Sequence, residues 1–391
     1  MRAVVVSFAL FSSACATAPA ADVRVPSGFT IEAIARVPGA REIAALPDGD
    51  LLVGTAGRDV YLVSDAEGKI PPSARVFASF DDERASGVAY VPALHDIFVA
   101  TMHRVWSIPY HGERSAERLA RVADVRNGPV APGTDGDVHV TTSVAYAGGL
   151  VYVAVGSSCN ATMAGGRPCV ESDPTRAAVS MMRPDGSGFT LRAKRVRNAI
   201  ALAVNPETGA LWIGDAGQDD LPAGHPYEFL DDLSAHPGVA DYGWPECEED
   251  RHAYVAGANC SRTVQPLVEL PAYSTIIGAA FYPLRQGGRY AFPKKYRGGL
   301  FVAAHGSWHQ TAGGCSAAPP RVVFVAMNGD RPVTSVDWSN PAAQWSDFVT
   351  GFQRGCIERS GRPTGVAVGS QGSLFIGDDA SGSVYRVRPN D

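Results

Sequence analysis

The feature that most constrains the fold is a short motif that recurs along the chain. Each copy has a small apolar segment, a turn, and then a run of β-branched or aromatic residues. Turn sequences such as Pro-Asp-Gly and Gly-Gly join the parts, and the runs after them are typical of β-strands. The copies span residues 46–53, 91–99, 146–153, 204–213, 296–302 and 368–376.

Six copies at intervals of roughly 45 to 90 residues predict an all-β, six-bladed β-propeller. Each blade is a small sheet that buries both faces only when it packs against neighbours around an axis. We expect the ring to close where residues 23–34 add a strand to the blade containing residues 383–387. Helical periodicity is scarce, and only residues 116–124 and 232–236 are candidates for short helical pieces.

The N-terminus has the pattern of an export signal. Met1-Arg2 is followed by an apolar run, Ala3–Phe11, and by the small residues before Cys15. This run is too short to span a bilayer. We predict a signal peptide over residues 1–22, a single propeller domain over residues 23–391, and no transmembrane span. The box ending at Cys15 predicts a lipid anchor, and cleavage near residues 18–21 is the alternative, so the protein is expected in the periplasm or as an outer-membrane lipoprotein.

The cysteines agree with export. Once Cys15 is set aside, six of the seven remain, and an even number in an exported protein predicts disulfides. Sequence proximity favours the pairs Cys159 with Cys169, Cys247 with Cys260, and Cys315 with Cys356, although 15 pairings are possible. Zinc is the rival hypothesis, but neither Cys-x-x-Cys spacing nor a matching His is present.

The charge of the chain argues against nucleic acid as a partner. The formal net charge is −6 at pH 7. A nucleic-acid-binding protein needs a basic surface, and this sequence has no long run of like charges. We therefore predict no nucleic-acid partner.

The stretch from Arg195 to Cys247 holds the most concentrated polar signal. A predicted hairpin carries Arg197-Asn198 before one strand and the acidic loop of residues 215–220 after the other. A cationic donor pair near an oxygen-rich loop suits a ligand that combines carboxylates with a hard cation such as Ca²⁺.

Other polar loops precede or follow the repeated strands. They contain His139, residues 155–159, residues 303–308 and Arg362-Pro363. Ligands of propellers usually bind at one end of the central channel, where loops from different blades meet. The architecture therefore predicts that these loops come together there.

With these motifs in place, the sequence resembles the soluble pyrroloquinoline-quinone (PQQ)-dependent sugar dehydrogenases, most closely the sorbosone-dehydrogenase-like branch. The resemblance covers most of the chain after residue 22, and that family is a six-bladed propeller. The motifs that carry it are Val155-Gly-Ser-Ser-Cys159, Arg197-Asn198, Leu211-Trp-Ile-Gly-Asp215, Tyr242-Gly-Trp-Pro-Glu-Cys247, His305-Gly-Ser-Trp308 and Arg362-Pro363.

The resemblance implies a role for each site residue. His139 matches the catalytic base that removes the proton of the anomeric hydroxyl, a task that suits a neutral imidazole. The cofactor, PQQ, is implied to contact Arg197, Asn198, His305 and Arg362. The cofactor's calcium ion is implied to bind at Gly217 and Gln218, with Asp219 as a further ligand, because calcium takes oxygen ligands.

Two functional hypotheses follow. The first is an exported quinoprotein that oxidises an aldose or related sugar aldehyde with Ca²⁺-bound PQQ and passes electrons to an external acceptor. The second is a cofactor-free propeller that acts as a binding or scaffold module at the cell envelope, and Tyr227 and His309-Gln310, which depart from the family pattern, favour it. A calcium-dependent lactonase is a third, weaker hypothesis. Trp244 and Trp308 are expected to be packing residues.

Overall fold

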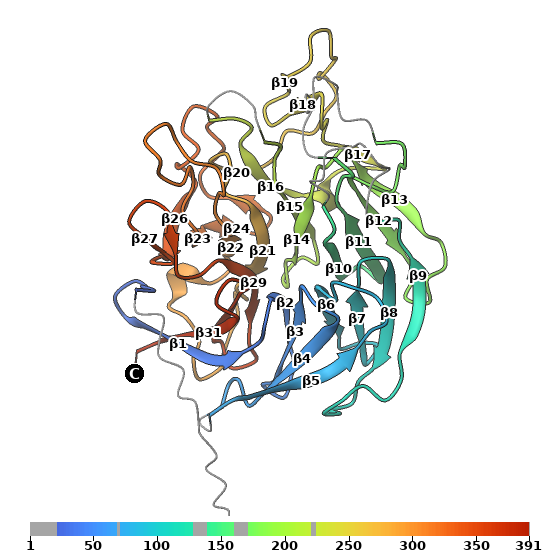
Figure 1. Ribbon diagram of the computed structural model, residues 1–391, viewed down its shortest axis with the longest axis vertical. Coiled ribbons are helices and arrows are strands. Elements are labelled where there is room, and N and C mark those ends of the chain that lie inside the picture. Colours follow the sequence, from blue (N-terminus) through green and yellow to red (C-terminus); the bar gives the residue numbers. More distant parts are fainter. Residues whose placement is uncertain (1–21, 69–70, 128–138, 160–170, 220–223, 391) are drawn as a thin grey trace, which may run out of the picture.

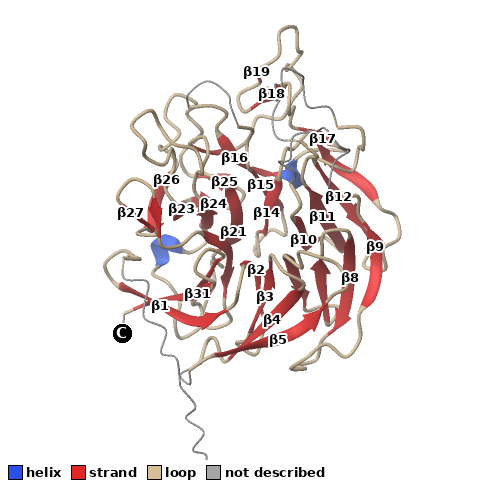
Figure 2. Cartoon of the chain, in the orientation of Figure 1, coloured by secondary structure: helices blue, strands red, loops and turns tan. Residues whose placement is uncertain are grey.

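The protein is built from antiparallel sheets arranged around a central axis, and it is described by a computed structural model of residues 22–68, 71–127, 139–159, 171–219 and 224–390 (Figure 1). Six large sheets form the blades, which confirms the prediction of an all-β, six-bladed propeller. Figure 2 shows strands throughout the body and only short helical turns.

The blades follow one another along the chain. Blade 1 contains β2 (Ala40–Ala45), β3 (Leu51–Thr55), β4 (Asp59–Ser64) and β5 (Ser73–Ser79), and blade 2 contains β6 (Gly87–Val91), β7 (Asp96–Ala100), β8 (Arg104–Pro109) and β9 (Ala120–Asp124). Blade 3 contains β10 (Thr142–Ala147), β11 (Leu150–Val155), β12 (Ala178–Met182), β13 (Thr190–Lys194) and the short β17 (Ala240–Asp241). Blade 4 contains β14 (Ala199–Val204), β15 (Leu211–Asp215), β16 (Glu228–Asp232) and β20 (Val268–Leu270).

The remaining elements complete the ring and its loops. Blade 5 contains β21 (Ile276–Phe281), β22 (Leu300–Ala304), β23 (Arg321–Val325) and β26 (Trp345–Val349), and blade 6 contains β29 (Pro363–Val368), β30 (Leu374–Asp378), β31 (Ser383–Pro389) and β1 (Phe29–Arg36). Two-stranded hairpins are β18 (Cys247–Glu248) with β19 (His252–Ala253), β24 (Met327–Asn328) with β25 (Arg331–Pro332), and β27 (Gln353–Arg354) with β28 (Glu358–Arg359). The 3₁₀ turns are η2 (Leu233–Ala235) and η3 (Lys294–Tyr296).

Each sequence repeat enters the second strand of a blade. The six copies lead into β3, β7, β11, β15, β22 and β30. The first strands of neighbouring blades, β2, β6, β10, β14, β21 and β29, contact one another in a closed cycle around the axis. The expected helical piece at 232–236 is the 3₁₀ turn η2, whereas the one at 116–124 was wrong, because its second half is the edge strand β9.

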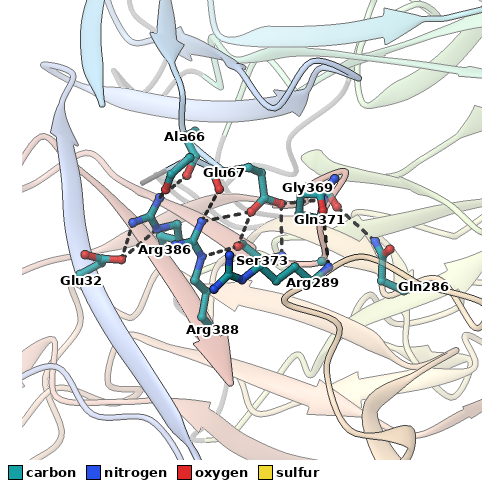
Figure 3. A network of polar contacts seen from close by, with 12 residues as sticks. Glu32, Ala66, Glu67, Gln286, Arg289, Gly369, Gln371, Ser373, Arg386 and Arg388 are labelled. Atoms are coloured by element: carbon teal, nitrogen blue, oxygen red, sulfur yellow. Dashed lines mark hydrogen bonds and ion pairs between the residues drawn. The ribbon is translucent and has the colours of Figure 1, made fainter. Parts of the chain in front are cut away.

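The ring closes as the sequence predicts. β1 pairs antiparallel with β31, so the two ends of the described chain share blade 6. Between blades 1 and 6 lies a polar network, here called the closure network, formed by Glu32, Glu67, Ser373, Arg386 and Arg388 (Figure 3). Its two arginines lie on β31 and reach across to the turn that follows β4.

Apolar side chains fill the spaces between blades. Each inner and middle strand has a largely buried face, and the buried residues form several clusters. The cluster that joins blades 5 and 6 is rich in aromatic rings, including Phe29, Phe292, Phe301 and Phe348. Phe29 belongs to the closing strand β1, so closure buries aromatic surface as well as pairing backbone.

Two predicted disulfides are present. Cys247 bonds Cys260 and Cys315 bonds Cys356. Such bonds are typical of proteins outside the cytoplasm. The third predicted pair involves Cys169, which lies outside the described residues, as do the predicted signal peptide through residue 21 and its Cys15. Within the described ranges, no helix has the length and apolar character needed to cross a membrane.

Candidate functional site

A cavity lies at the end of the central channel where the inner strands begin. Its volume is about 170 Å³. His139 precedes β10, Arg197-Asn198 precede β14, and Arg362 precedes β29, and all of them line the cavity. Gly217 and Asp219 line it as well, whereas Gln218 and His305 are not among its lining residues. Sequence positions more than two hundred residues apart therefore meet in one site.

The hydrogen bonds around His139 fix its tautomer. The Ser157 hydroxyl donates to the Cys159 carbonyl at 2.6 Å, so its oxygen accepts from the His139 Nδ1–H at 2.7 Å. The lone pair of Nε2 is then the free one. Burial, with the charge of Arg197 acting in the same direction, lowers the pKa of His139 well below its ordinary value. The imidazole is therefore neutral near pH 7, with Nε2 as a proton acceptor.

Two residues that were not predicted as site residues support His139. A Cβ on Gly156 would lie 2.4 Å from the His139 Cβ and 2.6 Å from the Asn198 side-chain oxygen, so only glycine lets these two residues sit side by side. Arg176 donates to the carbonyls of Gly156 and Ser157 at 3.2 and 3.0 Å, which holds the loop after β11 that contacts the imidazole. The Gly at 156 was visible in the sequence motif, but the role of Arg176 had no local signal.

Arg197 is buried, with 4% of its surface exposed, and is anchored to the loop of residues 215–219. Its guanidinium donates to the Ala216 carbonyl at 2.9 Å and to Asp219 at 3.2 Å. The Asn198 backbone N–H donates to the Asp215 carboxyl group at 2.6 Å. The donor pair and the acidic loop predicted from sequence are thus joined directly.

The loop of residues 216–219 presents backbone to the cavity at Gly217. A Cβ there would lie 2.7 Å from the Pro226 side chain, so the loop can pack this closely only with glycine. The Gln218 side chain points away and donates to Glu248 at 3.2 Å. The Asp219 carboxylate bridges Arg197 and the imidazole of His309, which lies 2.7 Å away.

Buried acids lie near this loop and outnumber the buried Arg197. Burial raises the pKa of Asp215 to about 7 and that of Glu228 to about 8, and it raises the pKa of Glu248 well above the usual range. Glu228 lines the cavity, and among the described residues Glu248 Oε1 has no hydrogen-bond partner. A cation bound at the loop would stabilise the ionised form of these acids.

This donor set fits a calcium ion better than a transition metal. In the described part of the chain, no three His, Cys, Asp or Glu side chains are grouped as a chelating cluster. Calcium accepts backbone carbonyl and carboxylate oxygens in flexible geometry. The loop at Gly217, with Glu228 beside it, offers ligands of that kind.

The opposite wall is built on Arg362. Its guanidinium donates to the carbonyls of His305 and Gly306 at 3.1 and 2.6 Å, and burial lowers its pKa to about 10. His305 stands behind this wall, where its Nε2 meets Asp379 at 2.9 Å and burial lowers its pKa to about 4. The structure therefore gives His305 a supporting position and leaves Arg362 facing the cavity.

Three aromatic residues that were not predicted as site residues line the same cavity. The His309 ring contacts those of Trp308 and Tyr273, whose centroids lie 3.9 and 4.5 Å from its own. Trp308 is 62% exposed, so the expectation that it packs in the interior was wrong, whereas Trp244 is buried as expected. The sequence showed His309 as a departure from the pattern of the family it resembles, but not the contact of His309 with Asp219.

Sequence comparisons match part of the chain to a family model and most of it to another protein. A family model described as TrAA12-like matches residues 246–390. A Borreliella burgdorferi protein described as uncharacterized is 21% identical over 383 residues, covering 93% of this chain and 90% of its own length.

Solved structures match almost the whole chain. The PQQ domain of a pyranose dehydrogenase from Coprinopsis cinerea, in its holo form, has a TM-score of 0.75 and 19% identity, with 94% of this chain and 97% of that chain covered. The family AA12 enzyme of Trichoderma reesei has a TM-score of 0.72 and 18% identity, with 94% and 98% covered. The PQQ-bound aldose sugar dehydrogenase of Streptomyces coelicolor has a TM-score of 0.60 and 15% identity, with 94% and 100% covered. The chain thus has the six-bladed propeller fold of these proteins.

Proposed function

We propose that the protein is an exported quinoprotein oxidoreductase that oxidises an aldose or related sugar aldehyde, including a sorbosone-like one, with Ca²⁺ and PQQ as cofactors. The observation that carries this proposal is the meeting of a neutral, oriented His139 with Arg197, Asn198 and Arg362 around one cavity. These residues were matched to the family from sequence alone, and a shared fold does not by itself place them together with suitable chemistry.

The cavity residues have separate roles in the proposed reaction. His139 Nε2 accepts the proton of the sugar's anomeric hydroxyl, while Ser157 holds Nδ1–H and prevents the ring from turning. Arg362 and Arg197 supply positive charge for carboxylates, which guanidinium groups bind through charge-assisted hydrogen bonds. Bound PQQ would supply the hydride acceptor, and calcium would polarise its reactive carbonyl.

The calcium ion would bind beside the loop of Gly217. Carbonyl oxygens of Gly217 and Gln218 and the carboxylate of Glu228 are the ligands we assign to it. Asp219 has its carboxylate engaged by Arg197 and His309, so we place it beside the ion's ligands as the residue that joins the loop to the cavity wall.

One observation favours the alternative of a cofactor-free propeller. Asp219 already neutralises Arg197, at 3.2 Å, and so competes with a cofactor carboxylate for this guanidinium. On this hypothesis the cavity keeps its architecture and binds no quinone, and the protein serves as a binding or scaffold module at the cell envelope.

A titration of the purified protein with PQQ, with and without calcium, tests the proposal. We expect a Kd in the micromolar range or below, dependence on calcium, and bleaching of the quinone absorbance when an aldose is added. Arg362→Gln should weaken PQQ binding about tenfold or more, because it removes a partly buried charge contact. Absence of PQQ binding at micromolar concentrations in the presence of calcium would exclude the quinoprotein hypothesis and leave that of a cofactor-free scaffold.

We also propose that residues 1–22 direct export and that Cys15 carries a lipid. Expression of the full chain in a bacterial host with radiolabelled palmitate tests both. The proposal predicts labelled protein in the membrane fraction and loss of the label in Cys15→Ser. An unlabelled protein in the periplasm would instead support cleavage near residues 18–21.

A further inference from the structure

Trp308 is an exposed aromatic residue at the rim of the ligand cavity. With 62% of its surface exposed, it belongs to a small set of large apolar residues that face solvent in the described chain. Of that set, only Trp308 lines the cavity. An indole of this size is seldom left in water without a partner, and Trp is enriched where ligands and proteins are bound.

The loop that carries Trp308 is held by its neighbours. The Trp308 ring lies 3.9 Å from that of His309, and Asp219 holds the His309 imidazole at 2.7 Å. The backbone on either side is tied down as well, because Ser307 O accepts from Arg359 and the His309 carbonyl accepts from Ala317 N at 3.0 Å. The Cys315–Cys356 disulfide links this loop to the β27–β28 hairpin. A loop held in this way loses little conformational entropy when its exposed indole binds a ligand.

The size of the cavity decides which ligand reaches Trp308. The volume of about 170 Å³ is below the roughly 300 Å³ at which pockets for drug-sized ligands begin. A cavity of this size has no room for both a three-ring quinone beside Arg197 and Asn198 and a sugar. The second substrate must then lie at the open rim, between the quinone and solvent, and Trp308 is the aromatic side chain exposed there.

We propose that Trp308 is the sugar-binding platform of this site. It stacks on the face of a pyranose ring that carries only C–H bonds, and it thereby orients the anomeric hydroxyl toward His139. This inference rests on the proposed function and adds the substrate class: aldoses in the pyranose form, with no axial hydroxyl on the stacked face, in preference to open-chain aldehydes.

Steady-state kinetics of the calcium- and PQQ-loaded protein test the platform. In Trp308→Ala we expect the KM for glucose or xylose to rise about tenfold, the order of magnitude of one aromatic contact. The KM for glyceraldehyde, which has no ring face, should stay within about twofold of the wild-type value. Trp308→Phe should recover most of the lost affinity, because it restores a flat ring.

A second measurement removes turnover from the test. 1,5-Anhydroglucitol has the pyranose ring of glucose and no anomeric hydroxyl, so it binds without being oxidised. Its Kd for the calcium- and PQQ-loaded protein, measured by calorimetric titration, should rise about tenfold in Trp308→Ala. Val333→Ala, at another exposed apolar residue outside the cavity, is the matched control and should leave every constant unchanged.

The outcomes separate the platform from the function on which it rests. If the wild type neither binds PQQ nor oxidises sugars, the proposed function is wrong and the platform falls with it. If the wild type is active but Trp308→Ala changes the KM for pyranoses and for glyceraldehyde alike, the proposed role of Trp308 is wrong and the proposed dehydrogenase activity is still supported. A large loss of PQQ affinity in Trp308→Ala would mean that the indole contacts the cofactor, which also contradicts the platform.

Discussion

Two charged regions of this propeller, the closure network and the ligand cavity, are built on opposite principles. In the closure network, Glu67 accepts from the backbone N–H groups of Gln371 and Ser373 at 3.1 and 3.2 Å, from the Ser373 hydroxyl and from Arg388 (Figure 3). The acids around the cavity have fewer donors, and burial raises the pKa of Glu228 to about 8.

The difference separates structural charge from functional charge. A buried ion stabilises a fold only when partners inside the chain compensate its lost hydration. The closure network meets that condition, and its role ends with joining blades 1 and 6. The cavity does not meet that condition. Its acids therefore favour a bound cation, and its arginines favour a bound anion.

The largest effect we expect is at His139. His139→Ala should lower turnover by about 10³-fold, because it removes the proton acceptor from the site. PQQ affinity should change by less than about threefold, since the guanidinium and amide contacts remain. Turnover is measured with a saturating aldose, and PQQ affinity by absorbance titration. Retention of wild-type turnover would show that the catalytic base lies elsewhere. The charged groups of the cavity could then no longer be contrasted with the closure network as functional charge.

The second prediction concerns the closure network. Glu67→Gln should lower the free energy of unfolding by about 3 kcal/mol, because an amide leaves Arg388 and several donors without their carboxylate. The midpoint of chemical unfolding measures this change. The PQQ affinity of the folded protein should stay unchanged, because the network does not line the cavity. A loss of ligand affinity equal to that of Arg362→Gln would contradict the division into two regions.

Sequence reasoning predicted the fold further than the site. The turn and strand chemistry of each repeat is local, so six blades, the closing pair β1–β31 and two disulfides were accessible from the sequence. The site is assembled from loops of four blades, and only residues with a family motif were found. Arg176 and Tyr273 were missed because their roles depend on contacts that no local pattern encodes.

Glu42 offers a matched counterpart to Glu67, since both acids belong to blade 1. Glu42 lies on β2 and lines a smaller axial cavity together with residues of all six inner strands, including Ile200, Ile277 and Gly365. Asn198, Thr275 and Arg362, which directly precede three of these strands, line the ligand cavity, so the two cavities follow each other along the axis. Within the described chain, Glu42 Oε1 accepts no hydrogen bond.

The third and smallest effect is expected at Glu42. Burial raises its pKa from 4.5 to about 8, against the opposing effects of Ser143 and Arg41. The folded state therefore holds a proton that the unfolded state releases above pH 4.5, so its contribution to stability is complete below that pH and is lost as the pH rises toward 8. Glu42→Gln cannot titrate, and should be more stable than the wild type by about 2 kcal/mol at pH 8, after a discount for the solvent access of the channel.

The comparison of Glu67 with Glu42 is tested by measuring the unfolding midpoints of both glutamine variants and the wild type between pH 4.5 and pH 8.5. Glu67→Gln should be less stable than the wild type, because Arg388 and several other donors lose their carboxylate partner. The difference between Glu42→Gln and the wild type should instead grow with pH and level off above the folded-state pKa. If both variants lost the same stability at every pH, Glu42 would be as well compensated as Glu67, and the uncompensated charge would be confined to the ligand cavity instead of continuing along the axis.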